Sequence, residues 1–235
     1  MSALRPLARE AQRPIAWTKE STLCVPASFS EMSGKGRARD AVKERWLRPA
    51  DLDRAIVAPP ERIWIPLFRV EGAVDGFHLG LRATSGARGR ILPTGGFRHH
   101  DGVVLVPARA GFSIDPSELA TFARADLRPF DDVDPPASEL IQPDVDSESA
   151  EDEARLRLRR KGEPQQALYA SVDVKIRSVA LVFLPVWVVR YLYAGEASDA
   201  ESEYHAAISA HSGGLVSERH PPVFGSLKSR IKSWF

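Results

Sequence analysis

The chain has 235 residues, of which 43% are hydrophobic and 27% charged, and its 32 basic residues nearly balance its 31 acidic ones. These values are typical of a globular protein that buries a core, and they argue against binding of nucleic acid through overall charge. Because Cys24 is the only cysteine, the chain can form neither an internal disulfide nor a zinc ribbon, and a reducing, cytoplasmic setting is expected.

Residues 1–22 are predicted to be a flexible N-terminal segment, since they are mostly polar and include Pro6 and Pro14. Apolar residues at helical spacing predict a helix over 28–48. The outer face of that helix is basic, and its candidate surface consists of Arg37, Arg39, Lys43 and Arg45. The face has two interpretations, a solvated helix surface or a nucleic-acid contact through residues 35–48, and the balanced overall charge favours the first.

A strand pair is predicted next. Residues 63–73 form one strand, Asp75-Gly76 is a turn signal, and residues 77–83 return as a second strand. The many glycines in 84–97 indicate a loop, and the apolar run 103–107 indicates a short buried strand.

Two helices and a linker are predicted in the middle of the chain. Asp115 is a candidate N-cap for a helix that runs to about residue 125. Residues 128–147 are acidic and rich in proline, which is typical of a linker. The helix predicted over 147–161 has acids first and bases last, an order that its dipole favours without any partner.

The remaining elements are mostly strands. Alternating residues predict a half-buried strand over 169–177, and a long apolar strand follows over 179–193 after a break near Ser178. The apolar run within it falls short of the roughly 20 residues that a membrane-spanning helix needs. Further strands are expected over 204–210 and 215–218, joined by a tight turn.

One aromatic-proline motif occurs twice, as IWIPLF in Ile63–Phe68 and as VFLPVW in Val182–Trp187. A proline inside a strand belongs at an edge or a bulge, so Pro66 and Pro185 predict a shared bend. We therefore expect an α+β fold of two related antiparallel β-hairpin or meander units, each preceded by a helix. The predicted units span 23–127 and 148–222, either in one sheet or as separate lobes.

The sequence carries no strong catalytic motif. The cluster His99-His100-Asp101 is a poor metal site, because adjacent residues of a strand point to opposite faces. Neither a phosphate-binding loop nor a GxSxG serine is present. We therefore expect no enzyme activity, no cofactor and no metal. The alternative is a small-ligand or enzymatic pocket between the two units, lined by Trp64, Phe68, Trp187 and Tyr191.

The segment 223–235 is predicted to be a basic amphipathic tail without an acidic side chain. Its apolar face contains Leu227, Ile231, Trp234 and Phe235, and its bases are Lys228, Arg230 and Lys232. Such a helix suits an anionic membrane surface or a groove on a partner protein. The alternative is that it packs on its own sheet.

The order of motifs resembles a bacterial family of zinc-ribbon-headed proteins that are often labelled primosomal N′ or replication-factor-Y-like. The resemblance covers about residues 24–225, and it is most specific in LPVW with the following YLYAGE and in SGGLVSERHP. The family's zinc ribbon is absent here. The resemblance implies a non-catalytic accessory protein with a PspA-like or flotillin-like partner assembly in membrane stress or remodelling, and it supplies no catalytic residues.

From these observations we expect a cytoplasmic adaptor or scaffold that binds a protein assembly, peripheral to the inner membrane.

Overall fold

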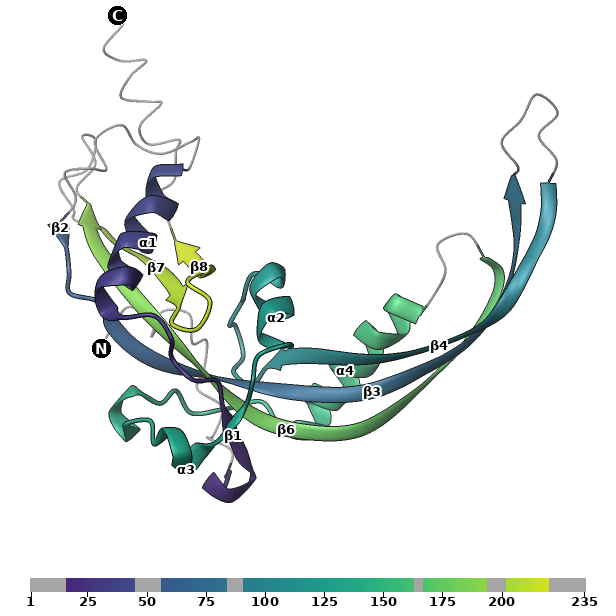
Figure 1. Ribbon diagram of the computed structural model, residues 1–235, viewed down its shortest axis with the longest axis horizontal. Coiled ribbons are helices and arrows are strands. Elements are labelled where there is room, and N and C mark those ends of the chain that lie inside the picture. Colours follow the sequence, from purple (N-terminus) through teal and green to yellow (C-terminus); the bar gives the residue numbers. More distant parts are fainter. Residues whose placement is uncertain (1–15, 45–55, 84–90, 163–166, 194–201, 220–235) are drawn as a thin grey trace, which may run out of the picture.

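The computed structural model describes residues 16–44, 56–83, 91–162, 167–193 and 202–219. The fold is α+β, as predicted, and its mostly antiparallel sheet curls into a half-barrel (Figure 1). The strands that the structure describes all belong to one eight-stranded sheet.

Three long strands form the centre of the sheet: β3 (Glu61–Ala83), β4 (Ile91–Pro107) and β6 (Ala167–Tyr193). The main path runs β4-β3-β6-β1-β5, and of its ladders only the one between β1 and β6 is parallel. The shorter strands are β1 (Thr22–Cys24), β2 (Ile56–Val57), β5 (Arg128–Pro129), β7 (Ser202–Ser209) and β8 (Leu215–Arg219).

The predicted helices are present in the structure. They are α1 (Glu31–Glu44), α2 (Pro116–Phe122) and α4 (Ser147–Gly162), and short turns occur at η2 (Lys19–Ser21), α3 (Phe130–Val133) and η4 (Ala137–Glu139). The Asp115 side chain accepts a hydrogen bond from the Ser117 N–H at 2.8 Å, which confirms the predicted N-cap of α2.

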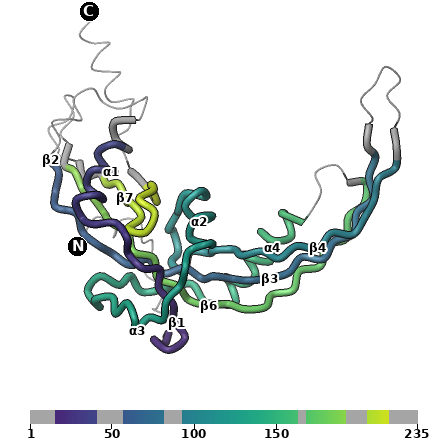
Figure 2. Tube along the Cα trace, viewed as in Figure 1, coloured from purple at the N-terminus to yellow at the C-terminus, as the bar shows by residue number. Residues whose placement is uncertain are grey.

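The molecule has a body and an arm. We use "arm" for β3 from Gly72 onward together with 91–102 of β4 and 167–177 of β6, which run side by side away from the body (Figure 2). Helix α4 lies along one face of the arm, here called the covered face, and the opposite face is called the open face. Helix α1 with β7 and β8 lies at the other end of the molecule (Figure 1).

The turn predicted at Asp75-Gly76 is wrong. Strand β3 continues through it to Ala83, and Gly76 pairs with Arg98 on one side and with Val172 on the other. Hydrogen-bonded ladders on both sides hold the backbone extended, and this pairing overrides the local turn preference.

The loop predicted over 84–97 is wrong from Ile91 onward, where β4 begins. Gly95 lies inside that strand, and a Cβ atom there would stand 2.7 Å from the Leu79 side chain and 2.9 Å from the His78 carbonyl oxygen. Glycine therefore permits close approach of two strands here and does not mark a loop.

The break predicted near Ser178 is a β-bulge within one continuous strand. Glu71 pairs with Ser178 and Gly72 with Ile176, so that Arg177 is the extra residue on β6. A bulge of this kind bends a strand without ending it, and the arm starts at this bend.

The two aromatic-proline motifs pair with each other. Ile65 stands opposite Leu184 at the centre, and the aromatic residue of each copy stands opposite the proline of the other, Trp64 with Pro185 and Phe183 with Pro66. The ladder therefore has local two-fold symmetry.

Both prolines lie in central strands, at neither of the two places, an edge or a bulge, that the sequence predicted for them. The Pro66 carbonyl accepts from the Ala108 N–H at 3.0 Å and the Pro185 carbonyl from the Ala210 N–H at 2.9 Å. Since the N and O of one strand residue point to the same side, the missing donors face away from the β3–β6 ladder. Pro66 lies where the ladder between β3 and β4 ends, and Pro185 lies where β6 changes its partner from β1 to β7. The ladder between β3 and β6 therefore loses no hydrogen bond to either proline.

The core of the body covers both faces of the central strands. Trp64, Phe68 and Phe183 lie on the face that α3 and α4 cover, and Ile65 and Leu184 lie on the face that α2 covers. Among the elements that the structure describes, only α4 packs on the arm, and it covers one face.

Candidate binding surface on the arm

The predicted binding residues of the tail lie outside the described residues; they are Leu227, Lys228, Arg230, Ile231, Lys232, Trp234 and Phe235. Arg45 of the predicted basic surface also lies outside them. Arg37 and Arg39 are exposed on α1, and Lys43 lies in the same helix. The exposed Asp40 lies beside Arg39, so the exposed part of this surface carries mixed charge.

The four aromatic residues of the alternative pocket do not gather around one cavity. Trp64 and Phe68 are core residues, 2% and 7% exposed, and Tyr191 is 5% exposed. Trp187 packs against Gly34 of α1, and its Nε1–H donates to the Phe29 carbonyl at 2.9 Å. The interface between the two motifs is therefore filled with side chains, which gives the pocket hypothesis no support.

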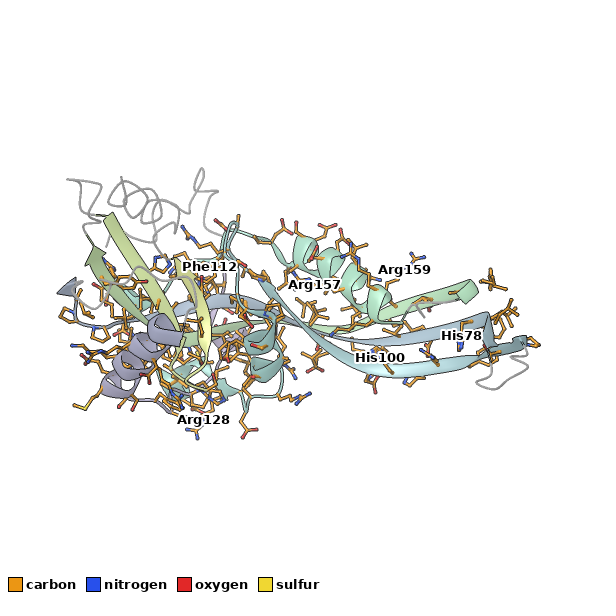
Figure 3. All side chains as sticks on the ribbon, turned by 90° about the horizontal axis from the view of Figure 1, so that it is seen from above. His78, His100, Phe112, Arg128, Arg157 and Arg159 are labelled. Carbon is orange, nitrogen blue, oxygen red and sulfur yellow. The ribbon has the colours of Figure 1, made fainter. Side chains whose placement is uncertain are left out.

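The histidines are dispersed. His99 and His100 point to opposite faces of β4, and no group of metal-binding side chains occurs among the described residues. His205 is buried at 4% exposure in the body, whereas His78 lies far along the arm (Figure 3). These four histidines therefore do not form one cluster.

The open face of the arm carries an exposed apolar patch that the sequence analysis missed. We call it the arm patch: Phe77, Leu79, Leu81, Phe97 and Tyr169. Phe97 is 87% exposed, Tyr169 58%, Leu79 48% and Leu81 47%.

The register places these side chains together. Phe77 pairs with Phe97 across β3 and β4, with ring centroids 5.0 Å apart, and Leu79 pairs with Tyr169 of β6. Leu81 follows on the same face toward the end of the arm, because alternate strand residues share a face.

A charged network borders the arm patch on its body side. The carboxylate of Asp75 lies 2.6 Å from Nδ1 of His99 and 3.4 Å from Nζ of Lys175. These hydrogen bonds, first that to His99 and then that to Lys175, hold the pKa of Asp75 below its usual range. Asp101 extends the network by its ion pair with Arg177 at 2.7 Å. Charged and apolar rows thus meet at one line across the arm.

A second feature lies on the covered face, where α4 ends. A shallow cavity of about 390 Å³ is bounded by Val74 and Gly76 of β3, by residues 97–100 of β4, which include Arg98 and His100, and by Lys161 and Gly162 of α4. We call it the cationic cavity. Figure 3 shows His100 and His78 along the strands and Arg157 and Arg159 on the neighbouring α4.

A smaller cavity of about 20 Å³ lies in the body next to Phe112 and His205. It has room for about one water molecule. Of these two cavities, the one on the arm is the larger.

Part of the arm patch can be found in the sequence. Phe77, Leu79 and Leu81 alternate with His78, Gly80 and Arg82, which predicts one apolar face. The pattern does not show that this face lacks a covering element, and the predicted strand over 77–83 carried no statement about which side chains are exposed.

Comparison of the chain with models of known families, with curated proteins and with solved structures gave no match. In the part of the chain that the structure describes, no helix is both long enough and apolar enough to cross a membrane.

Proposed function

We propose that this protein is a non-catalytic adaptor that binds a protein assembly at a membrane surface, with the arm as its point of attachment to the lipid. The observation that carries the proposal is the arm patch. On the open face of the arm, Phe97, Leu79 and Tyr169 expose apolar surface to water, and this surface has no structural role in the core.

The distribution of side chains along the arm supports a lipid surface. The charged network lies at the row of Asp75 and His99, and every residue of the arm patch lies farther out. From Asp75 to Leu81 is six residues of strand, or about 20 Å at roughly 3.3 Å per residue. Interfacial elements bury their apolar side about 5–10 Å deep, so the outer part of the patch is long enough to enter the acyl boundary.

The paired aromatic-proline motifs fit the scaffold part of the proposal. In this interpretation the two motifs are the remains of two related units that share one sheet, and they form a rigid centre between body and arm. The resemblance to the zinc-ribbon-headed accessory family favours a PspA-like or flotillin-like assembly as the protein partner at the cytoplasmic face of the membrane. The basic tail, 223–235, is proposed as a second contact to membrane or partner.

The test is sedimentation of the full chain with phospholipid vesicles. Phe97→Ser removes the most exposed apolar side chain of the arm patch, and Met32→Ser is the matched control because Met32 is 84% exposed on α1, at the other end of the molecule. Transfer of a Phe side chain to an apolar environment contributes about 1.5–3 kcal/mol, so Phe97→Ser is expected to weaken vesicle binding about tenfold or more. Met32→Ser is expected to leave it unchanged.

Two results would refute the attachment by the arm. One is wild-type protein that does not sediment with vesicles of any composition. The other is equal binding by the two variants. Thermal unfolding of both variants serves as the control for folding, since both side chains are exposed and their loss is expected to change stability little.

A further inference from the structure

We propose that the cationic cavity binds the anionic headgroup of a phospholipid, so that the arm selects anionic membranes. This inference rests on the proposed function and adds the chemical class of lipid. It is carried by the cavity of about 390 Å³ in which Arg98, His100 and Lys161 meet on the covered face of the arm.

The cavity is formed where a helix ends above glycine. Gly76 pairs with Arg98 across β3 and β4, and a Cβ atom there would have only ordinary contacts, at 3.7 Å and beyond. Because glycine has no side chain, the floor of the cavity at this position consists of backbone alone. Gly162 ends α4 so close to the sheet that a Cβ atom would stand 2.6 Å from Val74, which leaves Lys161 at the rim.

The described residues that line this cavity carry charge of one sign. None of them is acidic, and the sequence from Gly76 to His100 contains no Asp or Glu. Within the described part of the chain, no carboxylate forms an ion pair with Arg98 or Lys161, in contrast to Arg155 and Arg157, which pair with glutamates on α4. A phosphate group would accept hydrogen bonds from both cations and balance their charge.

The position of the cavity favours a lipid headgroup as the source of that phosphate. The pair Gly76–Arg98 is the next row inward from Phe77–Phe97, so the cavity lies at the level where the arm patch begins. If the patch enters the acyl boundary, the cavity stands among the headgroups. Free phosphate or a nucleic acid would gain nothing from exposed Leu79 and Leu81.

The experiment compares the full chain on vesicles of phosphatidylcholine alone and of phosphatidylcholine mixed with phosphatidylglycerol. The test variant is Arg98→Ala with Lys161→Ala. The control, Arg124→Ala with Arg128→Ala, removes the same charge from exposed positions in the body. Wild type and control are expected to prefer the anionic vesicles. The test variant is expected to lose about 30-fold in affinity for them, which corresponds to about 2 kcal/mol for two cations, and to keep its weaker binding to neutral vesicles.

Each outcome decides a separate point. If wild type binds both vesicles equally, the headgroup inference is wrong and the attachment by the arm patch stands. If the control loses as much as the test variant, the effect is general charge and the cavity has no role. Inorganic phosphate and a DNA duplex are the remaining probes. Suppose that either probe displaces the wild type from vesicles with an affinity equal to that for the vesicles, and that the test variant no longer binds the probe. The cavity would then be assigned to that ligand, and the lipid assignment would be overturned.

Discussion

Cys24 illustrates how burial alone fixes the chemistry of a side chain. Cys24 lies in β1 next to β6, and its thiol is fully buried in the core. This burial raises its pKa from 9.0 to about 12 against a smaller, opposite effect of the hydrogen bond from the Phe183 backbone. A thiol that keeps its proton in a closed core is a poor nucleophile. The residue is therefore a small core side chain and not a reactive site.

This pKa predicts a loss of stability in alkali. Above about pH 9 the thiol ionises in the unfolded chain, while the folded chain holds its proton up to about pH 12, so unfolding releases a proton and stability falls as pH rises between these values. At about pH 10 the ionisation of Cys24 is expected to lower the free energy of unfolding by about 1.4 kcal/mol relative to neutral pH. Urea unfolding of wild type and Cys24→Ala from about pH 8 to about pH 10 measures it. The variant is expected to lose less stability across the range, and identical slopes would contradict the prediction.

At the scale of the element, helix α1 shows how packing decides the effect of one residue type at two positions. Gly34 and Gly36 both lie inside α1, where glycine is normally unfavourable. A Cβ atom at Gly34 would stand 2.8 Å from the Trp187 ring, whereas at Gly36 it would meet nothing within 4 Å. Trp187 cannot easily move aside, because its Nε1–H is bonded to Phe29 and the Arg62 guanidinium lies over its ring.

Replacement of these two glycines by alanine is expected to have opposite effects. Gly36→Ala should stabilise the protein by about 0.5–1 kcal/mol, since alanine loses less backbone entropy in a helix. Gly34→Ala should destabilise it by about 1–3 kcal/mol through overpacking against Trp187. Chemical denaturation of the two variants gives both values. A gain in stability for Gly34→Ala would show that α1 does not pack on Trp187 in this way.

The elements also show which parts of the fold could be predicted. The helices were found because their signals are local: Asp115 caps α2, and the acids and bases of α4 follow its dipole. The strands of the arm were misread at Asp75-Gly76 and over 91–97 because their length depends on partners far away in the chain. Glycines at 95 and 102 mark close packing against Leu79 and Leu158, and this reason for a glycine exists only in three dimensions.

The same limit applies to the candidate site. The residues of the arm patch come from three strands whose pairing joins positions about 90 residues apart, such as Leu79 and Tyr169. The alternation of apolar residues in 77–82 is visible in the sequence, but the sequence does not show that no described helix covers this face of the arm. Arg98 and Lys161 likewise lie far apart in the sequence. They meet at one cavity because of the pairing of β4 with β3 and the position at which α4 ends.

At the scale of the whole molecule, the two ends of the sheet differ in how well they are covered. In the body, Ile65 and Leu67 are fully buried beneath α2 while Trp64 is buried on the other face. In the arm, the open face exposes the arm patch and the charged network. A sheet with one uncovered face has fewer apolar contacts to hold its hydrogen bonds closed, so the arm belongs to the less stable part of the fold.

Hydrogen exchange along β3 tests this difference within one strand. Amides of residues 76–81 are expected to exchange at least about tenfold faster than those of 64–70, because opening of the outer arm does not require unfolding of the body. Adding vesicles with anionic lipid should slow exchange in 76–81 and leave 64–70 unchanged, because the proposed attachment to lipid is by the arm and not by this part of the body. The Phe97→Ser variant is the control, in which the vesicles are expected to protect 76–81 much less. Equal exchange of the two segments without vesicles would show that the sheet opens as one cooperative unit, and the arm would then have no separate stability for a membrane to increase.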